Sequence, residues 1–378
     1  MTHDILAKIQ ETNIDILTDI VRKDQSEPAF EIIEWSAQRL SDKGLNNPDG
    51  LWRVNGRGCI GRNFRNWSVV LKIINSSQQI VPLEHKDYWK REVMVAQSGL
   101  TMELPGPVHA PRFYRVDEQV GSVWLWMEYI ENQRTVRWVL EDFAFAAYQL
   151  GCWHGALQSH SITPEPWFAR QHYRVWEPFI SRPPDWQFSL HQKYMSDNVR
   201  NRFEQMCAER AVFYQALETL PQSFQHLDCH RRNLMIHRRQ SGQDELVPID
   251  WALCGMAPMG VELHPLINMS CLLLEWNCAS VKELDRVVFA NYMQGLHDVG
   301  WVGNVDLVRL GYTAWAAMHL AMILPHAMAN WFCSSERRTG VLRSFGRAEA
   351  DLYVEWLPLF ERVLDCGDEA RNLVKRLT

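Results

Sequence analysis

The stretch His226-Leu-Asp228-Cys-His-Arg-Arg-Asn233, followed by Ile249-Asp250-Trp251, contains the residues that most constrain the fold of this chain. The first stretch has the spacing H-x-D-x-x-x-x-N, and the second is a hydrophobic residue, an aspartate and an aromatic residue. Asp228 and Asn233 share one loop, whereas Asp250 follows a short β-prone run that we expect to fold back as a hairpin. The sequence therefore predicts that three carboxylate or amide side chains converge in one small volume.

These residue types meet the requirements of phosphoryl transfer. The acceptor hydroxyl needs a carboxylate beside it, and the donor phosphates need a metal ion held by oxygen ligands. In this pattern Asp228 is the candidate catalytic base, and Asn233 and Asp250 are the candidate Mg²⁺ ligands. The first motif alone recurs by chance, but a second motif at hairpin distance makes coincidence much rarer.

A second pair of charged residues lies upstream. Lys72 interrupts the apolar run Ser68–Ile74, and a lysine inside a strand is costly unless it is paired. Glu92 follows in a segment, residues 88–96, that is typical of a helix. In kinase-like folds a strand lysine reaches the nucleotide phosphates and is held by a glutamate of the next helix. We expect Lys72 and Glu92 to form this pair; the alternative is an edge strand that carries a lysine to prevent strand pairing.

Taken together, these motifs resemble those of the aminoglycoside phosphotransferase and choline kinase superfamily, the small-molecule relatives of protein kinases. The segment HLDCHRRNLMI, residues 226–236, resembles the catalytic loop of that superfamily, and VPIDWALCG, residues 247–255, resembles its metal-binding segment. The resemblance implies a bilobal, protein-kinase-like α+β fold. Its small lobe would be mainly antiparallel β-sheet, and its larger lobe mainly helical.

The resemblance also implies a nucleotide site. Lys72 and Glu92 would act on the phosphates of a nucleoside triphosphate, ATP or GTP, with Mg²⁺ as the cofactor. Residues 123–130 resemble the strand and hinge behind the base, with Glu128 and Tyr129 at the hinge. The resemblance does not decide between ATP and GTP.

The chain length favours two domains, because 378 residues exceed what one hydrophobic core usually supports. Residues 1–130 show a leading helical segment and then strand-like runs around one helix, and we expect them to form the nucleotide-binding lobe. Residues 131–378 are mainly helical in pattern, and we expect them to form the catalytic and acceptor-binding lobe. The turn expected to cover the phosphates, residues 41–50, lacks a G-x-G-x-x-G pattern, so its phosphate contacts cannot be carried over.

The acceptor expected from the resemblance is a small molecule with a hydroxyl group, of antibiotic-like, amino-sugar or amino-alcohol type. Glu262 and His264 follow the metal segment closely, and Glu275 lies on the next helical run. We expect these three residues to line the acceptor pocket, where acidic groups would face a cationic substrate. The alternative is that Glu262 caps a helix and Glu275 is solvated. The sequence does not identify the acceptor itself.

Two other functional classes fit part of the pattern. His226, Asp228 and His230 alternate, so on an extended segment they would face one side as zinc ligands of a hydrolase. That hypothesis leaves Asn233 and Asp250 unexplained. The other possibility is a non-catalytic nucleotide-binding protein of the same fold, which is disfavoured because each expected catalytic position is filled.

Composition restricts the partners and the compartment. The net charge of −6, with no basic run, predicts no nucleic-acid partner. Nine cysteines without C-x-x-C spacing are typical of reduced thiols in a cytoplasmic protein, and the N-terminus does not resemble a signal peptide. Residues 310–335 contain no charged residue, but His319, Pro325 and Asn330 favour a buried core helix over a membrane span. We therefore expect no membrane partner; the oligomeric state is not determined by the sequence.

Overall fold

The computed structural model of the chain describes residues 2–40, 50–132, 137–160, 162–180, 183–239, 241–332 and 334–377. The chain divides into two compact units: unit 1 comprises Met1–Pro82, Asp87–Leu104 and His109–Gln133, and unit 2 comprises Leu83–Lys86, Pro105–Val108 and Arg134–Thr378. The division into lobes at residue 130 stays a prediction. The turn expected to cover the phosphates lies outside the described residues except for Gly50.

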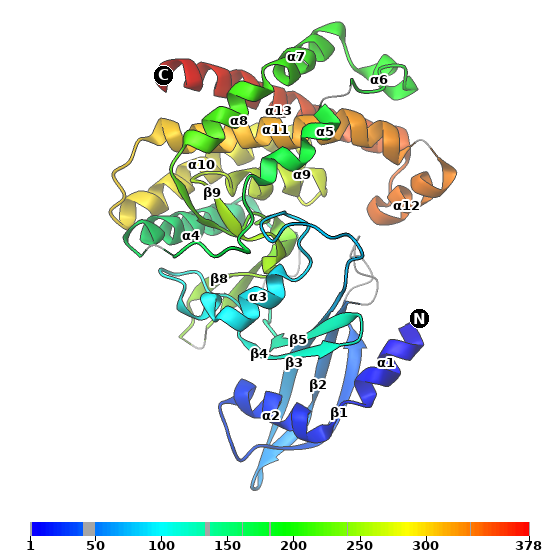
Figure 1. Ribbon diagram of the computed structural model, residues 1–378, viewed down its shortest axis with the longest axis vertical. Helices are drawn as coiled ribbons and strands as arrows, with labels where there is room; N and C mark the ends of the chain where they lie inside the picture. The colour runs from blue at the N-terminus through cyan, green and yellow to red at the C-terminus, as the bar shows by residue number, and fades with distance from the viewer. Residues whose placement is uncertain are drawn as a thin grey trace. The chain divides into compact units, whose positions relative to one another are not determined.

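Unit 1 is built on one antiparallel sheet with the strand order β1-β2-β3-β5-β4 (Figure 1). The strands are β1 (Glu31–Arg39), β2 (Leu51–Ile60), β3 (Asn63–Asn75), β4 (Phe113–Gln119) and β5 (Ser122–Glu128). The helices of this unit are α1 (Thr2–Gln10), α2 (Ile14–Gln25) and α3 (Arg91–Ser98), with a short 3-10 helix, η1, at Leu100–Glu103.

The two faces of this sheet differ because side chains alternate along each strand. Odd-numbered residues of β3, from Trp67 to Ile73, are buried in a core that also contains residues of α1 and α2. The even-numbered residue Val70 packs on the opposite face, against Val93 of α3. Lys72 shares that second face, so the strand presents its lysine toward α3.

Unit 2 is mainly helical and contains two small antiparallel sheets, β6–β9 and β7–β8. These strands are β6 (Gln222–Gln225), β7 (Leu234–Arg238), β8 (Asp244–Pro248) and β9 (Gly255–Pro258). The helices are α4 (Leu140–Ser159), α5 (Glu177–Ile180), α6 (Ser189–Tyr194), α7 (Asp197–Ala208), α8 (Arg210–Thr219), α9 (Ser270–Leu272), α10 (Val281–Asp298), α11 (Val305–Trp331), α12 (Ser335–Phe345) and α13 (Glu349–Leu377). An antiparallel sheet in one unit and a larger helical unit are the α+β arrangement that the sequence predicts.

The uncharged segment at 310–335 falls largely within α11. Within the described residues, α11 alone has the length and composition to cross a membrane, and 80% of its apolar window is buried inside the structure. That burial is typical of the core helix predicted for this segment. The eight cysteines in the described part of the chain are free thiols, most of them buried.

Helices α4 and α10 approach each other closely through glycines. Gly151 of α4 lies against the carbonyl oxygen of Tyr292, and Gly295 of α10 lies against the carbonyl oxygen of Tyr148. A Cβ atom at either glycine would overlap that oxygen. Because a helix backbone cannot rotate away as the end of a side chain can, glycine is required at both positions.

We expect Gly151→Ala to lower the free energy of unfolding by about 2–3 kcal/mol, because its methyl group forces α4 and α10 apart. Gly340→Ala is the matched control, since Gly340 lies inside the exposed helix α12 and a Cβ atom there meets nothing within 4 Å. That control should gain about 0.5–1 kcal/mol from helix propensity. Urea denaturation measures both changes, and an unchanged stability of Gly151→Ala would contradict the close approach.

Candidate active site

The H-x-D-x-x-x-x-N stretch forms the loop between β6 and β7. Its first residue, His226, anchors the loop through its side chain. The His226 side chain is buried, and its Nε2–H donates to the carbonyl oxygen of Ile249 at 3.0 Å. Its Nδ1 accepts the backbone N–H of Asp228 at 3.3 Å. The ring also packs edge-on against Trp251, with 4.7 Å between centroids. Nε2 of His226, together with the ring contact to Trp251, therefore fastens the loop to the segment that contains Asp250, whereas Nδ1 holds the backbone within the loop at Asp228.

Asp228 is held by the last residue of the same motif. The Asn233 side-chain amide donates to Asp228 Oδ2 at 2.8 Å and to the Asp228 carbonyl oxygen at 3.1 Å. The Asp228 side chain nevertheless keeps 29% of its surface exposed. The structure thus fixes the direction of this carboxylate and leaves it open to a ligand.

Asp250 is brought to the loop by the β7–β8 hairpin that the sequence predicts. Leu234 pairs with Pro248 in this hairpin, and the N–H of Ile249 donates to the carbonyl oxygen of Asn233 at 2.9 Å. Asp250 follows directly, in a left-handed conformation with φ of 63°. That conformation is uncommon outside glycine, although aspartate and asparagine tolerate it best. The three residues of the two motifs therefore lie within one local network.

His230 is a neutral neighbour of the candidate base. Its Nε2 lies 3.7 Å from Asp228 Oδ1, and its Nδ1 accepts the backbone N–H of Arg232 at 3.2 Å. Burial, with a smaller contribution from the positive charge of Arg232, lowers the pKa of His230 to about 4. The imidazole is consequently uncharged near neutral pH and forms no ion pair with Asp228 there.

The zinc hypothesis does not fit this geometry. Both ring nitrogens of His226 are used by backbone groups, and Nδ1 of His230 is used as well. No group of three or more His, Cys, Asp or Glu side chains in the described parts of the chain is arranged to hold a metal ion. His226, Asp228 and His230 alternate in sequence, but the loop is not the extended strand that would place them on one side.

Glu262 supports the backbone of the loop, a structural role that the sequence does not predict. It is fully buried, and its Oε1 accepts the backbone N–H of Leu227 at 2.7 Å. Leu227 adopts a φ of 67°, which is strained for a branched side chain. Burial raises the pKa of Glu262 to about 7, against the opposing effect of this hydrogen bond and others from the loop. Glu262 thus braces the loop one residue before Asp228.

The other two residues predicted for the acceptor pocket are also engaged by the protein. His264 is buried, with its Nε2 at 2.7 Å from Nδ1 of His319. Glu275 accepts a hydrogen bond from Arg232 Nε at 2.7 Å and lies 3.7 Å from Arg231 Nε. Of the three residues expected to line the acceptor pocket, Glu262 and His264 therefore lie in the core, and Glu275 lies beside two arginines.

In unit 1 the structure brings Lys72 and Glu92 together. Lys72 Nζ lies 2.5 Å from Glu92 Oε2, and the glutamate side chain is only 2% exposed. Such a buried pair requires both partners, because either charge alone would be left desolvated. Glu92 belongs to the first turn of α3, and Lys72 reaches it from the second face of the sheet.

The two hinge residues show different surroundings. The Glu128 carboxylate forms an ion pair with Arg112, at 3.1 Å from Nη2, so its side chain is committed to the protein. The Tyr129 ring lies under the guanidinium of Arg53, at 4.2 Å from its carbon to the ring centroid. Arg53 belongs to no sequence motif. Only the pairing register of β2 with β3, which places Arg53 opposite Val70, could have identified it as a neighbour of the hinge.

Comparison with known proteins gives a family and a fold. Residues 57–300 match the sequence model of the phosphotransferase enzyme family. No curated protein matches the chain at a significant level. A solved aminoglycoside phosphotransferase from Alicyclobacillus acidocaldarius is 15% identical, with a TM-score of 0.54 over 93% of this chain and 94% of that one. This likeness confirms the protein-kinase-like fold.

Two further solved structures are less similar in shape. A microcompartment-associated aminopropanol kinase is 12% identical, with a TM-score of 0.47 over 95% of this chain and 97% of that one. A spectinomycin phosphotransferase in complex with ADP and spectinomycin is 10% identical, with a TM-score of 0.45 over 94% of this chain and 98% of that one.

The raised pKa of Glu262 predicts a pH dependence of stability. Between the ordinary pKa of about 4.5 and the folded value of about 7, the folded chain binds a proton that the unfolded chain has released. Stability contributed by this group is therefore present below pH 4.5 and is lost as pH rises toward 7. Glu262→Gln removes this titration, so its free energy of unfolding relative to the parent should rise by about 2–3 kcal/mol from pH 5 to pH 7.5.

Urea denaturation at the two pH values measures this difference. The histidines with lowered pKa are present in both proteins and cancel in the comparison. A difference that does not change with pH would show that Glu262 is ionised in the folded protein.

Proposed function

This chain belongs to the phosphotransferase enzyme family, and from that membership we propose that it transfers the γ-phosphoryl group of ATP or GTP to a hydroxyl group of a small molecule. The observation that carries the proposal is the state of the Asp228 carboxylate. Asn233 fixes it by a hydrogen bond of 2.8 Å, and its side chain is partly exposed. The β7–β8 hairpin connects this loop to Asp250. A fixed and accessible carboxylate is what an in-line displacement needs beside the attacking oxygen.

In the proposed reaction Asp228 orients the acceptor hydroxyl and takes its proton as the oxygen attacks the γ-phosphorus. The bond from that phosphorus to the bridging oxygen breaks, and the nucleoside diphosphate leaves. Asn233 keeps the carboxylate in one rotamer through its amide. His230 is neutral, so it does not compete as a cation for the charge of Asp228. The brace from Glu262 to Leu227 fixes the backbone from which Asp228 projects.

The remaining oxygens suit a magnesium ion. Asn233 uses its nitrogen toward Asp228, which leaves its amide oxygen as a ligand atom, and Asp250 supplies a carboxylate from the neighbouring segment. Hard oxygen ligands of this kind are those that Mg²⁺ prefers. When bound, the ion would neutralise charge on the donor phosphates. In unit 1 Lys72, held by Glu92, would contact phosphates of a nucleotide, as the family resemblance implies.

The acceptor remains the class expected from sequence, an antibiotic-like, amino-sugar or amino-alcohol compound. Glu275 stays a candidate for acceptor contact, since its side chain is 20% exposed. Glu262 and His264 are withdrawn from that role because both are buried. A panel of hydroxylated metabolites and antibiotics, screened for nucleotide consumption by the purified protein, identifies the acceptor; no consumption, with nucleotide still bound, would favour the non-catalytic alternative.

We expect Asp228→Asn to lower kcat for phosphoryl transfer by about 10²–10⁴-fold, because an amide cannot accept the acceptor proton. The asparagine oxygen can still accept the hydrogen bond from Asn233, so the loop should stay folded and nucleotide affinity should change little. Steady-state kinetics and calorimetric titration with MgADP measure the two quantities. Near-normal turnover in this variant would refute the assigned base.

Lys72 and Glu92 should behave as one unit. We expect Lys72→Ala, Glu92→Ala and the double variant to lose similar activity, because each single change already breaks the pair. The measurement is kcat/KM for the nucleotide in the three variants. Losses that multiply in the double variant would show that the two residues act independently.

A further inference from the structure

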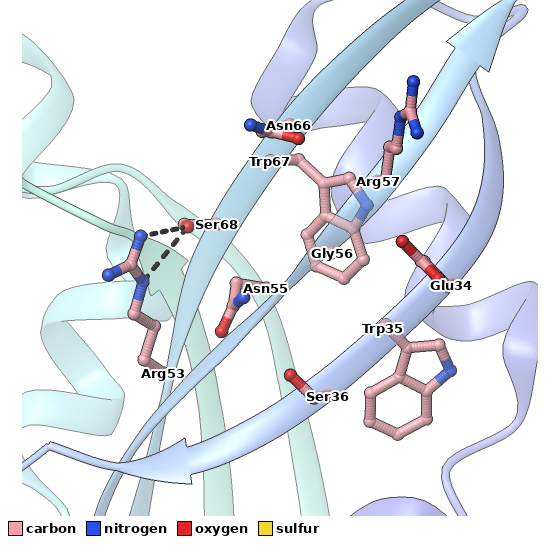
Figure 2. A pocket seen from close by; sticks show the side chains of 10 residues that line it. All are labelled: Glu34, Trp35, Ser36, Arg53, Asn55, Gly56, Arg57, Asn66, Trp67 and Ser68. Atoms are coloured by element: carbon pink, nitrogen blue, oxygen red, sulfur yellow. Dashed lines mark hydrogen bonds between the residues drawn. The ribbon is translucent and has the colours of Figure 1, made fainter.

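Unit 1 contains a polar pocket that no assigned role explains. It has a volume of about 480 Å³ and lies along β1, β2 and β3 (Figure 2). Asn55 of β2 is paired in register with Ser36 of β1 on one side and with Ser68 of β3 on the other, and all three line the pocket. Arg53 lines its end toward Val70, to which it is paired across the β2–β3 ladder.

This pocket lies on the same face of the sheet as Lys72. Residues 68, 70 and 72 of β3 point to one side because side chains alternate along a strand. Four residues of strand separate Ser68 from Lys72 by roughly 13 Å, which is comparable with the span of a nucleotide from its phosphates to the far edge of its base. Tyr129, at the hinge, contacts Arg53 at the pocket end of this span. A nucleotide whose phosphates meet Lys72 would therefore carry its base to Arg53.

Arg53 presents hydrogen-bond donors that the protein uses only in part. Its Nε and Nη2 both donate to Ser68 Oγ, at 3.1 and 2.9 Å, as Figure 2 shows. Within the described residues no carboxylate forms an ion pair with this guanidinium. A guanidinium has five N–H groups and no acceptor. Two of them donate to Ser68, so both N–H groups of Nη1 and the second N–H group of Nη2 remain available to a ligand with two adjacent acceptor atoms.

Asn55 adds the opposite preference two residues along the strand. Its Oδ1 is buried, and no donor in the described part of the chain hydrogen-bonds to it. A buried acceptor without a partner carries a free-energy cost that a ligand N–H group would remove. The pocket thus offers donors at Arg53 and an unsatisfied acceptor at Asn55, side by side on β2.

We infer that this pocket recognises the base of the donor nucleotide and that Arg53 makes it selective for guanine over adenine; the inference rests on the proposed function. Guanine presents O6 and N7 as adjacent acceptors, which match a guanidinium. Its N–H donors lie on the neighbouring Watson–Crick edge, which would reach Asn55. Adenine has an amino group in place of O6, so its donor would face the donors of Arg53. Arg53 is thus a specificity-determining residue, and GTP is the expected donor.

The experiment is calorimetric titration of the full chain with MgGDP and MgADP, which need no acceptor. We expect MgGDP to bind about tenfold or more tightly than MgADP, since a good bidentate contact discriminates bases to at least this extent. Arg53→Gln should bring the two dissociation constants close together. Arg53→Lys should do the same, because it keeps the charge and loses the forked geometry.

Arg65→Gln is the matched control, because Arg65 is an exposed arginine at an odd position of β3, on the other face of the sheet. It should keep the guanine preference, and melting temperatures without nucleotide verify that each variant is folded. Equal binding of both nucleotides, tighter MgADP binding, or a preference unchanged in both Arg53 variants would overturn the inference alone. If the parent protein binds neither nucleotide, the proposed function fails with it.

Discussion

A buried hydrogen bond from the backbone N–H of Leu227 to the carboxylate of Glu262 holds the loop of residues 226–233 in its observed conformation. Leu227 occupies the left-handed region, where a branched side chain is strained, and such a conformation persists only when its surroundings fix it. Glu262 supplies that constraint from outside the loop. Asp228 comes next in the chain, so the direction in which its carboxylate leaves the backbone depends on a buried residue outside the loop.

The other constraint on the loop is its connection to the β7–β8 hairpin. His226 donates to Ile249 at the start of the loop, and Ile249 donates to Asn233 at its end. Ile249 is therefore hydrogen-bonded to both the first and the last residue of the H-x-D-x-x-x-x-N motif, and Asp250 follows Ile249 directly. This arrangement explains why the two motifs need both their internal spacing and the hairpin between them. A change in hairpin length would move Asp250 without altering either motif.

The sequence predicts contacts well where the partners are set by local register. The Lys72–Glu92 pair, the Asp228–Asn233 contact and the hairpin that delivers Asp250 all follow from short spacings or from a strand followed by a helix. The α+β fold follows from the same motifs. What the sequence does not reveal is that Glu262 and His264 are buried, because burial is a tertiary property. His264 is buried against His319, which is 55 residues away in sequence, and no local pattern indicates that contact.

The charge near the loop also depends on tertiary contacts that the local sequence does not show. A sequence count of acidic residues after the metal segment suggests a negative pocket, but the fold removes most of that charge. Burial holds the pKa of Glu262 near 7, and Arg232 and Arg231 lie beside the carboxylate of Glu275. His230 adds no positive charge at neutral pH because its pKa is lowered. Asp228 and Asp250 are the two carboxylates that the motifs themselves bring to the loop. In the proposed reaction Asp228 would take the proton of the attacking hydroxyl, and Asp250 would hold the metal ion beside the donor phosphates.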